Sequence, residues 1–253
     1  MTRLPARGIL PLALVFALAA VAARAADAPP AARSAPARPA ARGVHFLYLV
    51  RHGMYDRDDH ADEVTGNGLD ALGHQQAKLL GARLAASGVT FHSLVSSDYL
   101  RARQTADDIG AQLHMTTVVD TLIHECTPTE LHPEYATQHS AADIAQCVSN
   151  LEAAWSRYFT PTPGADTWDL LVCHGNVIRW LTLKAMGADT TRWFANDIGN
   201  ASLTVIAVRP DGTCRLVTYS DTGHIPVDQQ TWAGRGPGWG GSRGNTTTPS
   251  GMK

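Results

Sequence analysis

The sequence predicts an α/β fold with three layers: a mainly parallel central sheet, helices on both faces and one antiparallel edge strand. Three observations lead to this fold class. Short apolar runs typical of buried strands alternate along the chain with longer segments whose apolar residues recur at helical spacing. The last two strand candidates follow one another directly, which predicts an antiparallel hairpin near one end of the sheet. Between two low-complexity ends, about 190 residues remain, the size of one large domain.

Six segments have the short length and the branched or aromatic content of strands. The first, VHFLYLV, ends directly before Arg51 and His52. The last two flank the turn sequence Pro210-Asp211-Gly212-Thr213, which predicts the hairpin. The predicted strands cover residues 44–50, 91–96, 115–119, 168–173, 201–208 and 215–219.

Four segments have the periodicity of helices facing a core. In the first, apolar residues recur from Leu69 to Leu84, and the segment stops at Ser87-Gly88, a typical glycine stop. Residues 121–139 show little periodicity and contain turn residues, which predicts a loop-rich region. The predicted helices cover residues 69–84, 99–113, 141–159 and 176–186.

The N-terminus has the pattern of an export signal, with Arg3 and Arg7 before an apolar run that ends near Ala23-Arg24-Ala25. The run has 16 residues and contains Pro11, which is short for a membrane-spanning helix. We therefore expect an exported protein, periplasmic or secreted, without stable membrane insertion after cleavage; the alternative is an N-terminal membrane anchor. The predicted organisation is a signal peptide (1–25), an Ala/Pro-rich linker (26–43), one domain (44–230) and a disordered Gly-rich tail (231–253).

The charge of the chain is unevenly distributed. Its formal net charge is −2, but residues 1–43 hold six Arg and one Asp, so 15 basic and 22 acidic residues, a net charge of −7, are left for the rest. Such a domain lacks the extended basic surface that nucleic acid requires, so we expect no nucleic-acid partner. A few arginines gathered in an acidic domain are better explained by a small anionic ligand.

The four cysteines are an even number, which in an exported protein permits a disulfide. Cys126 and Cys147 flank one loop-rich region and are the expected pair. Cys173 and Cys214 lie inside predicted strands, where a buried free cysteine is an equally good explanation.

Basic residues follow three predicted strands at the point where each strand ends. Arg51 and His52 follow the first, Arg101 lies at the start of the helix after the second, and His174 follows the fourth. Because ligands bind outside the carboxyl ends of strands in open α/β sheets, we expect these four side chains to converge. One arginine guanidinium can donate to two phosphate oxygens at once, and a neutral imidazole can attack phosphorus. The set predicts phosphoryl transfer through a phosphohistidine, with a protonated His174 helping the arginines to hold the developing charge.

Four segments occur in a fixed order along the domain: LVRHG (49–53), LDALGHQQA (69–77), SDYLRARQTA (97–106) and VCHGNVIR (172–179). Together they resemble the four blocks of the histidine phosphatase superfamily, phosphoglycerate-mutase-like branch. The resemblance extends over about residues 46–226 and identifies residues 44–230 as a histidine phosphatase domain.

The resemblance implies a role for each site residue. His52 is the expected nucleophile, and Arg51, Arg101 and His174 are the expected phosphate pocket. Glu125 falls where the family places its proton donor, although a solvated loop carboxylate is the alternative. Asn200 precedes a strand near the pocket and is a candidate phosphate contact, with a simple turn residue as the alternative.

We therefore expect a phosphomonoesterase that acts through phosphohistidine on a phosphorylated substrate, with phosphoserine and phosphothreonine in proteins as one substrate class. The alternatives are a phosphatase of sugar or nucleotide phosphates and a non-catalytic phosphate-binding module. The first block lacks the Glu-Ser of cofactor-dependent mutases, and the last has Gly175-Asn176 where acid phosphatases have His-Asp. We expect no cofactor and no metal, because the His, Glu and Cys residues between His124 and His139 match no metal-binding spacing. The oligomeric state stays open, a dimer being one option.

An acidic run follows the predicted nucleophile, consisting of Asp56, Asp58, Asp59, Asp62 and Glu63. A solvated loop is the simplest interpretation of such a run. The alternative is that it repels highly anionic substrates or selects basic peptides.

Overall fold

The computed structural model describes residues 43–58, 60–129 and 139–232, and all of them belong to one compact unit, Pro39–Lys253. The predicted signal peptide (1–25), the linker apart from Gly43 and the tail from residue 233 onward lie outside the described residues. Among the helices that the structure describes, none is both long and apolar enough to cross a membrane.

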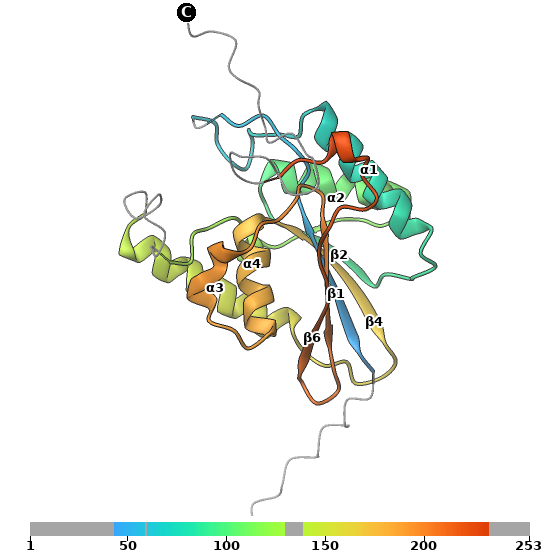
Figure 1. Cartoon of the computed structure of the whole chain (residues 1–253), viewed down its shortest axis with the longest axis vertical. Coiled ribbons are helices and arrows are strands. Elements are labelled where there is room, and N and C mark those ends of the chain that lie inside the picture. Colours follow the sequence, from blue (N-terminus) through green and yellow to red (C-terminus); the bar gives the residue numbers. More distant parts are fainter. Residues whose placement is uncertain (1–42, 59, 130–138, 233–253) are drawn as a thin grey trace, which may run out of the picture. The chain divides into compact units, whose positions relative to one another are not determined.

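The predicted α/β class is confirmed by a six-stranded sheet in the order β3-β2-β4-β1-β5-β6 (Figure 1). The strands β1, β2, β3 and β4 form a parallel group, whereas β5 is antiparallel to both β1 and β6. The antiparallel strand, β5, therefore lies next to the edge of the sheet, and β6 forms the edge itself. The strands are β1 (His45–Arg51), β2 (Ser93–Ser96), β3 (Val118–Val119), β4 (Thr167–Cys173), β5 (Leu203–Val208) and β6 (Cys214–Asp221).

Helices cover both faces of the sheet: α3 and α4 lie on one face, and α1 and α2 lie on the other (Figure 1). Two of these helices have a polar N-cap residue. At the start of one, the Asp70 carboxylate accepts the Gly73 N–H, and at the start of another, Ser140 forms a capping box with Asp143. The helices are α1 (Ala71–Ala85), α2 (Leu100–Leu113), α3 (Ala141–Tyr158) and α4 (Gly175–Ala185), with short 3₁₀ helices η1 (Thr121–Ile123), η2 (Thr190–Ala195) and η3 (Val227–Gln229).

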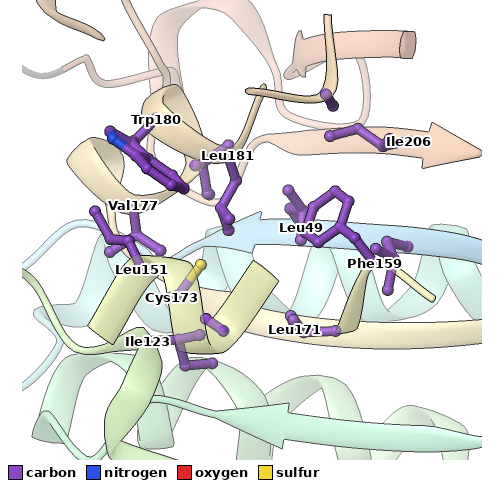
Figure 2. Packing of buried hydrophobic residues seen from close by; sticks show 14 of the residues in the cluster. Leu49, Ile123, Leu151, Phe159, Leu171, Cys173, Val177, Trp180, Leu181 and Ile206 are labelled. Atoms are coloured by element: carbon purple, nitrogen blue, oxygen red, sulfur yellow. The ribbon is translucent and has the colours of Figure 1, made fainter. Parts of the chain in front are cut away.

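The hydrophobic core has two parts, because side chains of a strand point alternately to the two faces of a sheet. In β4, Leu171 and Cys173 belong to the cluster with α3 and α4, whereas Leu170 and Val172 belong to the cluster with α1 and α2. Fully burying a leucine side chain stabilises a fold by roughly 2 kcal/mol. Figure 2 shows the first cluster, in which Leu49, Leu171, Cys173 and Ile206 of the sheet pack near Leu151 of α3 and Val177, Trp180 and Leu181 of α4.

Some predicted boundaries are wrong, and two of the errors have a clear local cause. The strand predicted at 115–119 is formed only by Val118–Val119. Helix α1 begins at Ala71 rather than at Leu69, because Asp70 caps it and Leu69 pairs with Tyr55 in a β-bridge. Strand β5 begins at Leu203 rather than at Ala201, whose φ of 48° is incompatible with a strand.

The predicted start of the tail at residue 231 is also wrong. Thr231 is buried, and its Oγ donates to Asn200 Oδ1 at 3.0 Å. Trp232 forms a β-bridge with Gly199. The packed domain therefore includes at least these two residues.

Candidate active site

Strand register brings the predicted site residues together at the carboxyl ends of the parallel strands. Arg51 ends β1 and is paired with Cys173, which ends β4. His52 and His174 follow these residues directly, and their ring centroids are 5.2 Å apart. Ser97 follows the end of the neighbouring strand, β2, and its N–H donates to β4. The predicted convergence at this edge of the sheet is therefore present.

His52 has the geometry of a neutral nucleophile. Its side chain is buried, and Nδ1 lies 2.8 Å from the Gly53 carbonyl oxygen, so Nδ1 carries the proton and donates it. Nε2 accepts a hydrogen bond from Arg101 Nε at 3.3 Å. Burial, followed by the charges of Arg51 and Arg101, lowers the pKa of His52 well below its ordinary value. An unprotonated Nε2 therefore faces the site.

Gly53 allows the chain to turn away from the nucleophile. A Cβ at this position would lie 2.6 Å from the Gly73 carbonyl oxygen at the start of α1, which is too close for any side chain. The Gly53 N–H donates to Thr105 Oγ1 at 3.0 Å, which ties the segment to α2 as well. The Arg-His-Gly sequence thus has a structural reason for its third residue.

Asn200 supports the segment that carries the nucleophile. Its Nδ2 donates to the carbonyl oxygens of His52 at 3.2 Å and Gly53 at 3.3 Å. Its Oδ1 accepts from Thr231 Oγ1. Asn200 is buried and is not among the residues that line the cavity above His52. Its contacts are with the segment that carries the nucleophile, and its role as a phosphate contact stays a prediction.

Arg51 is a buried cation with an unused donor. Its Nη1 donates to the Ile198 carbonyl oxygen at 2.8 Å, whereas Nε has no hydrogen-bond partner among the described residues. Burial, assisted by the charge of Arg179, lowers the pKa of Arg51 to about 10. Arg51 therefore remains charged at neutral pH and can bind an anion.

Arg101, which carries the hydrogen bond to the nucleophile, packs against two aromatic rings. Its guanidinium carbon lies 4.6 Å from the centroid of the Tyr55 ring and 5.0 Å from that of Tyr99. The side chain of Arg101 is only 4% exposed, so its orientation is strongly fixed. The fixed guanidinium keeps its Nε directed at His52.

His174 is fully buried at the N-cap of α4. Its Nε2 lies 2.8 Å from Ser97 Oγ, and its Nδ1 has no partner among the described residues. Burial, followed by the charges of Arg101 and His52, lowers the pKa of His174 well below its ordinary value. In the free site, the low-dielectric surroundings and neighbouring cations disfavour a charge on His174. The protonated His174 expected from the sequence concerns the site that holds a phosphoryl group, so it stays a prediction. A neutral His174 that accepts from Ser97 leaves an Nδ1–H to donate to phosphate.

Glu125 is carried by an irregular segment that follows η1. Its carbonyl oxygen accepts from Tyr99 Oη at 3.4 Å, and the next residue, Cys126, forms a disulfide with Cys147 of α3. The Cys126 carbonyl oxygen accepts from Asn176 Nδ2 at 3.0 Å. The predicted pairing of Cys126 with Cys147 is confirmed, and it attaches the Glu125 segment to the helical layer.

The Glu125 carboxyl group is suited to carry a proton. Burial raises its pKa above the ordinary value, although the charges of Arg101 and Arg51 oppose the shift. Its Oε1 is buried and has no hydrogen-bond partner among the described residues. A carboxyl group whose pKa is raised can hold a proton and deliver it to a departing oxygen, which is the role of a general acid.

A cavity of about 490 Å³ is lined by four of the predicted site residues, Arg51, His52, Arg101 and Glu125, but not by His174, and its lining also includes residues that were not predicted. Tyr55, Tyr99 and Arg179 lie in or next to the four sequence blocks, which is the signal that could have identified them. Phe194 lies on η2, a 3₁₀ helix without a clear sequence pattern. The lining consists of Arg51, His52, Tyr55, Arg57, Glu63, Tyr99, Arg101, Glu125, Cys126, Thr127, His139, Asn176, Arg179 and Phe194.

Within the described ranges, no group of three or more His, Cys, Asp or Glu side chains is arranged to hold a metal ion. The chemistry of the site does not call for one, because Arg51 and Arg101 supply positive charge and Glu125 supplies a proton.

Comparisons with known proteins agree with this geometry. The model of the histidine phosphatase superfamily (branch 1) matches residues 47–158 and 127–222. The mitochondrial serine/threonine-protein phosphatase PGAM5 of Homo sapiens is 31% identical over 198 residues, which cover 76% of this chain and 67% of that protein. Pgam5 of Caenorhabditis elegans is 32% identical over 189 residues, or 72% of this chain and 65% of that protein. The chain thus matches about two thirds of the length of these relatives.

Solved structures share the fold. A phosphoserine phosphatase variant from Entamoeba histolytica in complex with phosphoserine has a TM-score of 0.54 at 19% identity and covers 72% of this chain and 100% of that chain. A phosphoglycerate mutase from Plasmodium falciparum has a TM-score of 0.52 at 21% identity and covers 73% of this chain and 96% of that chain. At these identities the similarity establishes the architecture.

Proposed function

This chain belongs to the histidine phosphatase superfamily (branch 1), and we propose that it hydrolyses phosphoserine and phosphothreonine esters in proteins through a phosphohistidine intermediate. One observation carries the proposal. A neutral His52, whose Nδ1 is held and whose Nε2 faces Arg101, opens onto the same cavity as the Glu125 carboxyl group, whose pKa is raised by burial. The serine/threonine-protein phosphatases that match the chain support the substrate class.

In the first step, His52 Nε2 attacks phosphorus while the bond from phosphorus to the ester oxygen breaks. The leaving oxygen takes the bonding electron pair and receives the Glu125 proton. The phosphoryl oxygens displace the Arg101 contact with Nε2 and accept hydrogen bonds from Arg51, Arg101 and the His174 Nδ1–H. The product of this step is phosphohistidine at Nε2 and a free alcohol.

In the second step, water attacks the phosphorus of the intermediate. The Glu125 carboxylate accepts one proton from that water, and the bond from phosphorus to Nε2 breaks with its electrons returning to the imidazole. Inorganic phosphate leaves, and both His52 and Glu125 regain their initial protonation states. One carboxyl group therefore serves as acid and then as base.

A substrate panel tests the proposed class. Turnover of phosphoserine and phosphothreonine peptides, sugar phosphates and nucleotides is compared as kcat/KM for the full chain. We expect kcat/KM to be at least tenfold higher for the phosphopeptides than for the small molecules. The ratio of these values measures how much more strongly the site binds one transition state than the other. Higher values for the sugar phosphates or nucleotides would replace the proposal with a small-molecule phosphatase, and turnover of none of them would indicate a binding module.

We also propose that the protein is exported. The N-terminal pattern of basic residues, an apolar run and small residues supports export, and the Cys126–Cys147 disulfide suits an oxidising compartment. N-terminal sequencing of protein from a cell fractionation tests this proposal. A mature chain that begins near residue 26 in the exported fraction is expected, and an intact N-terminus in the soluble cell interior would contradict it.

A further inference from the structure

The acidic run after the nucleophile brings one carboxylate into the active site. The Glu63 carboxylate forms an ion pair with Arg101 Nη1, and Glu63 lines the cavity. The Glu63 carbonyl oxygen accepts the Leu100 N–H at 3.0 Å, and the neighbouring Val64 carbonyl oxygen accepts from Arg103 Nη2 at 2.6 Å. These two contacts attach the loop to the start of α2 and fix the place of Glu63.

Glu63 and the nucleophile contact different nitrogens of the Arg101 guanidinium. Nε faces His52 Nε2, whereas Nη1 faces Glu63. Because the Arg101 guanidinium is buried and packs against the rings of Tyr55 and Tyr99, it has little freedom to rotate. A phosphoryl group on His52 therefore meets the Nε side of Arg101, and the Glu63 carboxylate can stay in place beside it.

The exposed fractions place Glu63 at the mouth of the cavity. The Glu63 side chain is 42% exposed, whereas that of Arg101 is 4% exposed. The transferring phosphate uses the charges of Arg51 and Arg101 deeper in the site, and Arg179 is paired with Asp197 at 3.3 Å. The part of the substrate that extends outward from the phosphate thus passes close to a negative charge.

We propose that Glu63 is a specificity-determining residue that favours phosphomonoesters with a positive charge close to the phosphate and disfavours those with a second negative charge there. The inference rests on the proposed function and narrows its substrate class to phosphoserine and phosphothreonine flanked by Lys or Arg. A charge pair at about 6 Å in a partly solvated site changes affinity by about tenfold. Arg57 also lines the cavity and is the same in all variants compared below.

The test compares two phosphoserine peptides that differ only in having Arg or Asp beside the phosphorylated residue. Glu63→Gln removes the charge while keeping an oxygen that can accept from Arg101, and Asp56→Asn removes a charge of the same loop from an exposed residue outside the cavity lining. The wild type is expected to prefer the Arg peptide in kcat/KM. Glu63→Gln should reduce this preference about tenfold, and Asp56→Asn should leave it within twofold. An unchanged preference in Glu63→Gln, or an equal loss in Asp56→Asn, would overturn the proposal.

A pair of small substrates separates this inference from the protein-phosphatase proposal. 2-Aminoethyl phosphate and phosphoglycolate carry an amine or a carboxylate two carbons from the ester oxygen. If peptides of both kinds fail as substrates while these esters are hydrolysed, the protein-phosphatase proposal is wrong, and the preference for the amine over the carboxylate still decides the role of Glu63. The ratio of kcat/KM for the amine to that for the carboxylate should be about tenfold lower in Glu63→Gln than in the wild type. An equal ratio in the two proteins would contradict the proposed role of Glu63.

Discussion

Burial acts on the two central residues of the site in the direction that each role requires. It disfavours charge, so it lowers the pKa of His52 and raises that of Glu125. A nucleophilic imidazole must be unprotonated, and a general acid must be protonated. One physical cause therefore prepares both groups, and the arginines supply the positive charge that the phosphate requires.

Replacing Glu125 by Gln tests its role as proton donor. An alkyl ester such as phosphoserine leaves as a strong base and needs the proton, so its kcat should fall by about 10²–10⁴-fold. A 4-nitrophenyl ester leaves as a weak base, so its kcat should fall less than tenfold. Steady-state kinetics of both esters give the comparison, and equal losses would contradict the acid role.

The pH profile gives a second measure of the same carboxyl group. In the wild type, kcat for the alkyl ester should fall as the pH rises through the raised pKa of Glu125, because the acid loses its proton. The 4-nitrophenyl ester should not show this basic limb. A basic limb of the same size for both esters would assign it to another group.

Asn200 is predicted to support catalysis through the segment that carries the nucleophile. Asn200→Ala removes both hydrogen bonds to the carbonyl oxygens of His52 and Gly53, so we expect kcat to fall by roughly tenfold or more as the nucleophile loses its position. The free energy of unfolding should fall by about 1–3 kcal/mol, because two buried acceptors lose a donor. An unchanged kcat in a folded variant would show that His52 is held without Asn200.

The segment that carries Glu125 is the least regular part of the site. Strand β3 has only two residues, and η1 is a single short turn. The disulfide from Cys126 to Cys147 joins this segment to α3, whose inner face belongs to the buried core. The position of the proton donor thus depends on a disulfide, whereas the positions of His52 and His174 depend on the register of the strands that they follow.

Removing the disulfide should therefore affect proton donation more than phosphate binding. The two cysteines are separated by 21 residues, and a loop of this size predicts a loss of about 3 kcal/mol in the free energy of unfolding for Cys126→Ser/Cys147→Ser. At temperatures where this variant remains folded, kcat for phosphoserine should fall more than kcat for the 4-nitrophenyl ester.

Denaturant unfolding and the two esters provide the measurements, and Cys214→Ser is the matched control at a partly buried free cysteine. Equal losses on both esters would mean that the disulfide stabilises the domain without positioning Glu125.

The end of β1 that lies opposite the active site holds a third buried histidine, His45. His45 Nε2 lies 2.7 Å from Asp169 Oδ2, and its Nδ1 lies 3.0 Å from the Thr160 carbonyl oxygen. Both ring nitrogens face acceptors, which favours the protonated form. Burial alone would lower the pKa of His45, but the interactions with Asp169 and Thr160 outweigh it, and the net shift is upward.

This pair predicts how stability depends on pH. A raised pKa in the folded state gives a contribution that is complete below the ordinary value of 6.5 and is lost as the pH rises through the folded pKa of His45. The difference in unfolding free energy between the wild type and His45→Gln should be largest below pH 6.5 and shrink above it. Denaturant unfolding across this range measures the difference, and a difference that grows with pH would contradict the assignment.

The sequence predicted what depends on periodicity and on the ends of strands. Alternating elements indicated the α/β sheet, and the sheet brings Arg51, His52 and His174 together because parallel strands end at one edge. Contacts made by loops were not predictable. Nothing in the local pattern shows that Glu63 reaches an arginine 38 residues away or that Asn200 points back at a carbonyl group.

A trapping experiment tests whether the phosphoryl group passes through His52. The wild type is mixed with a ³²P-labelled phosphoserine peptide, quenched within the first turnover, and analysed by peptide mapping. We predict an acid-labile label on the peptide that contains His52 and no such label in a folded His52→Ala variant. An equal label in the variant, or hydrolysis by the wild type without any acid-labile label, would contradict the account.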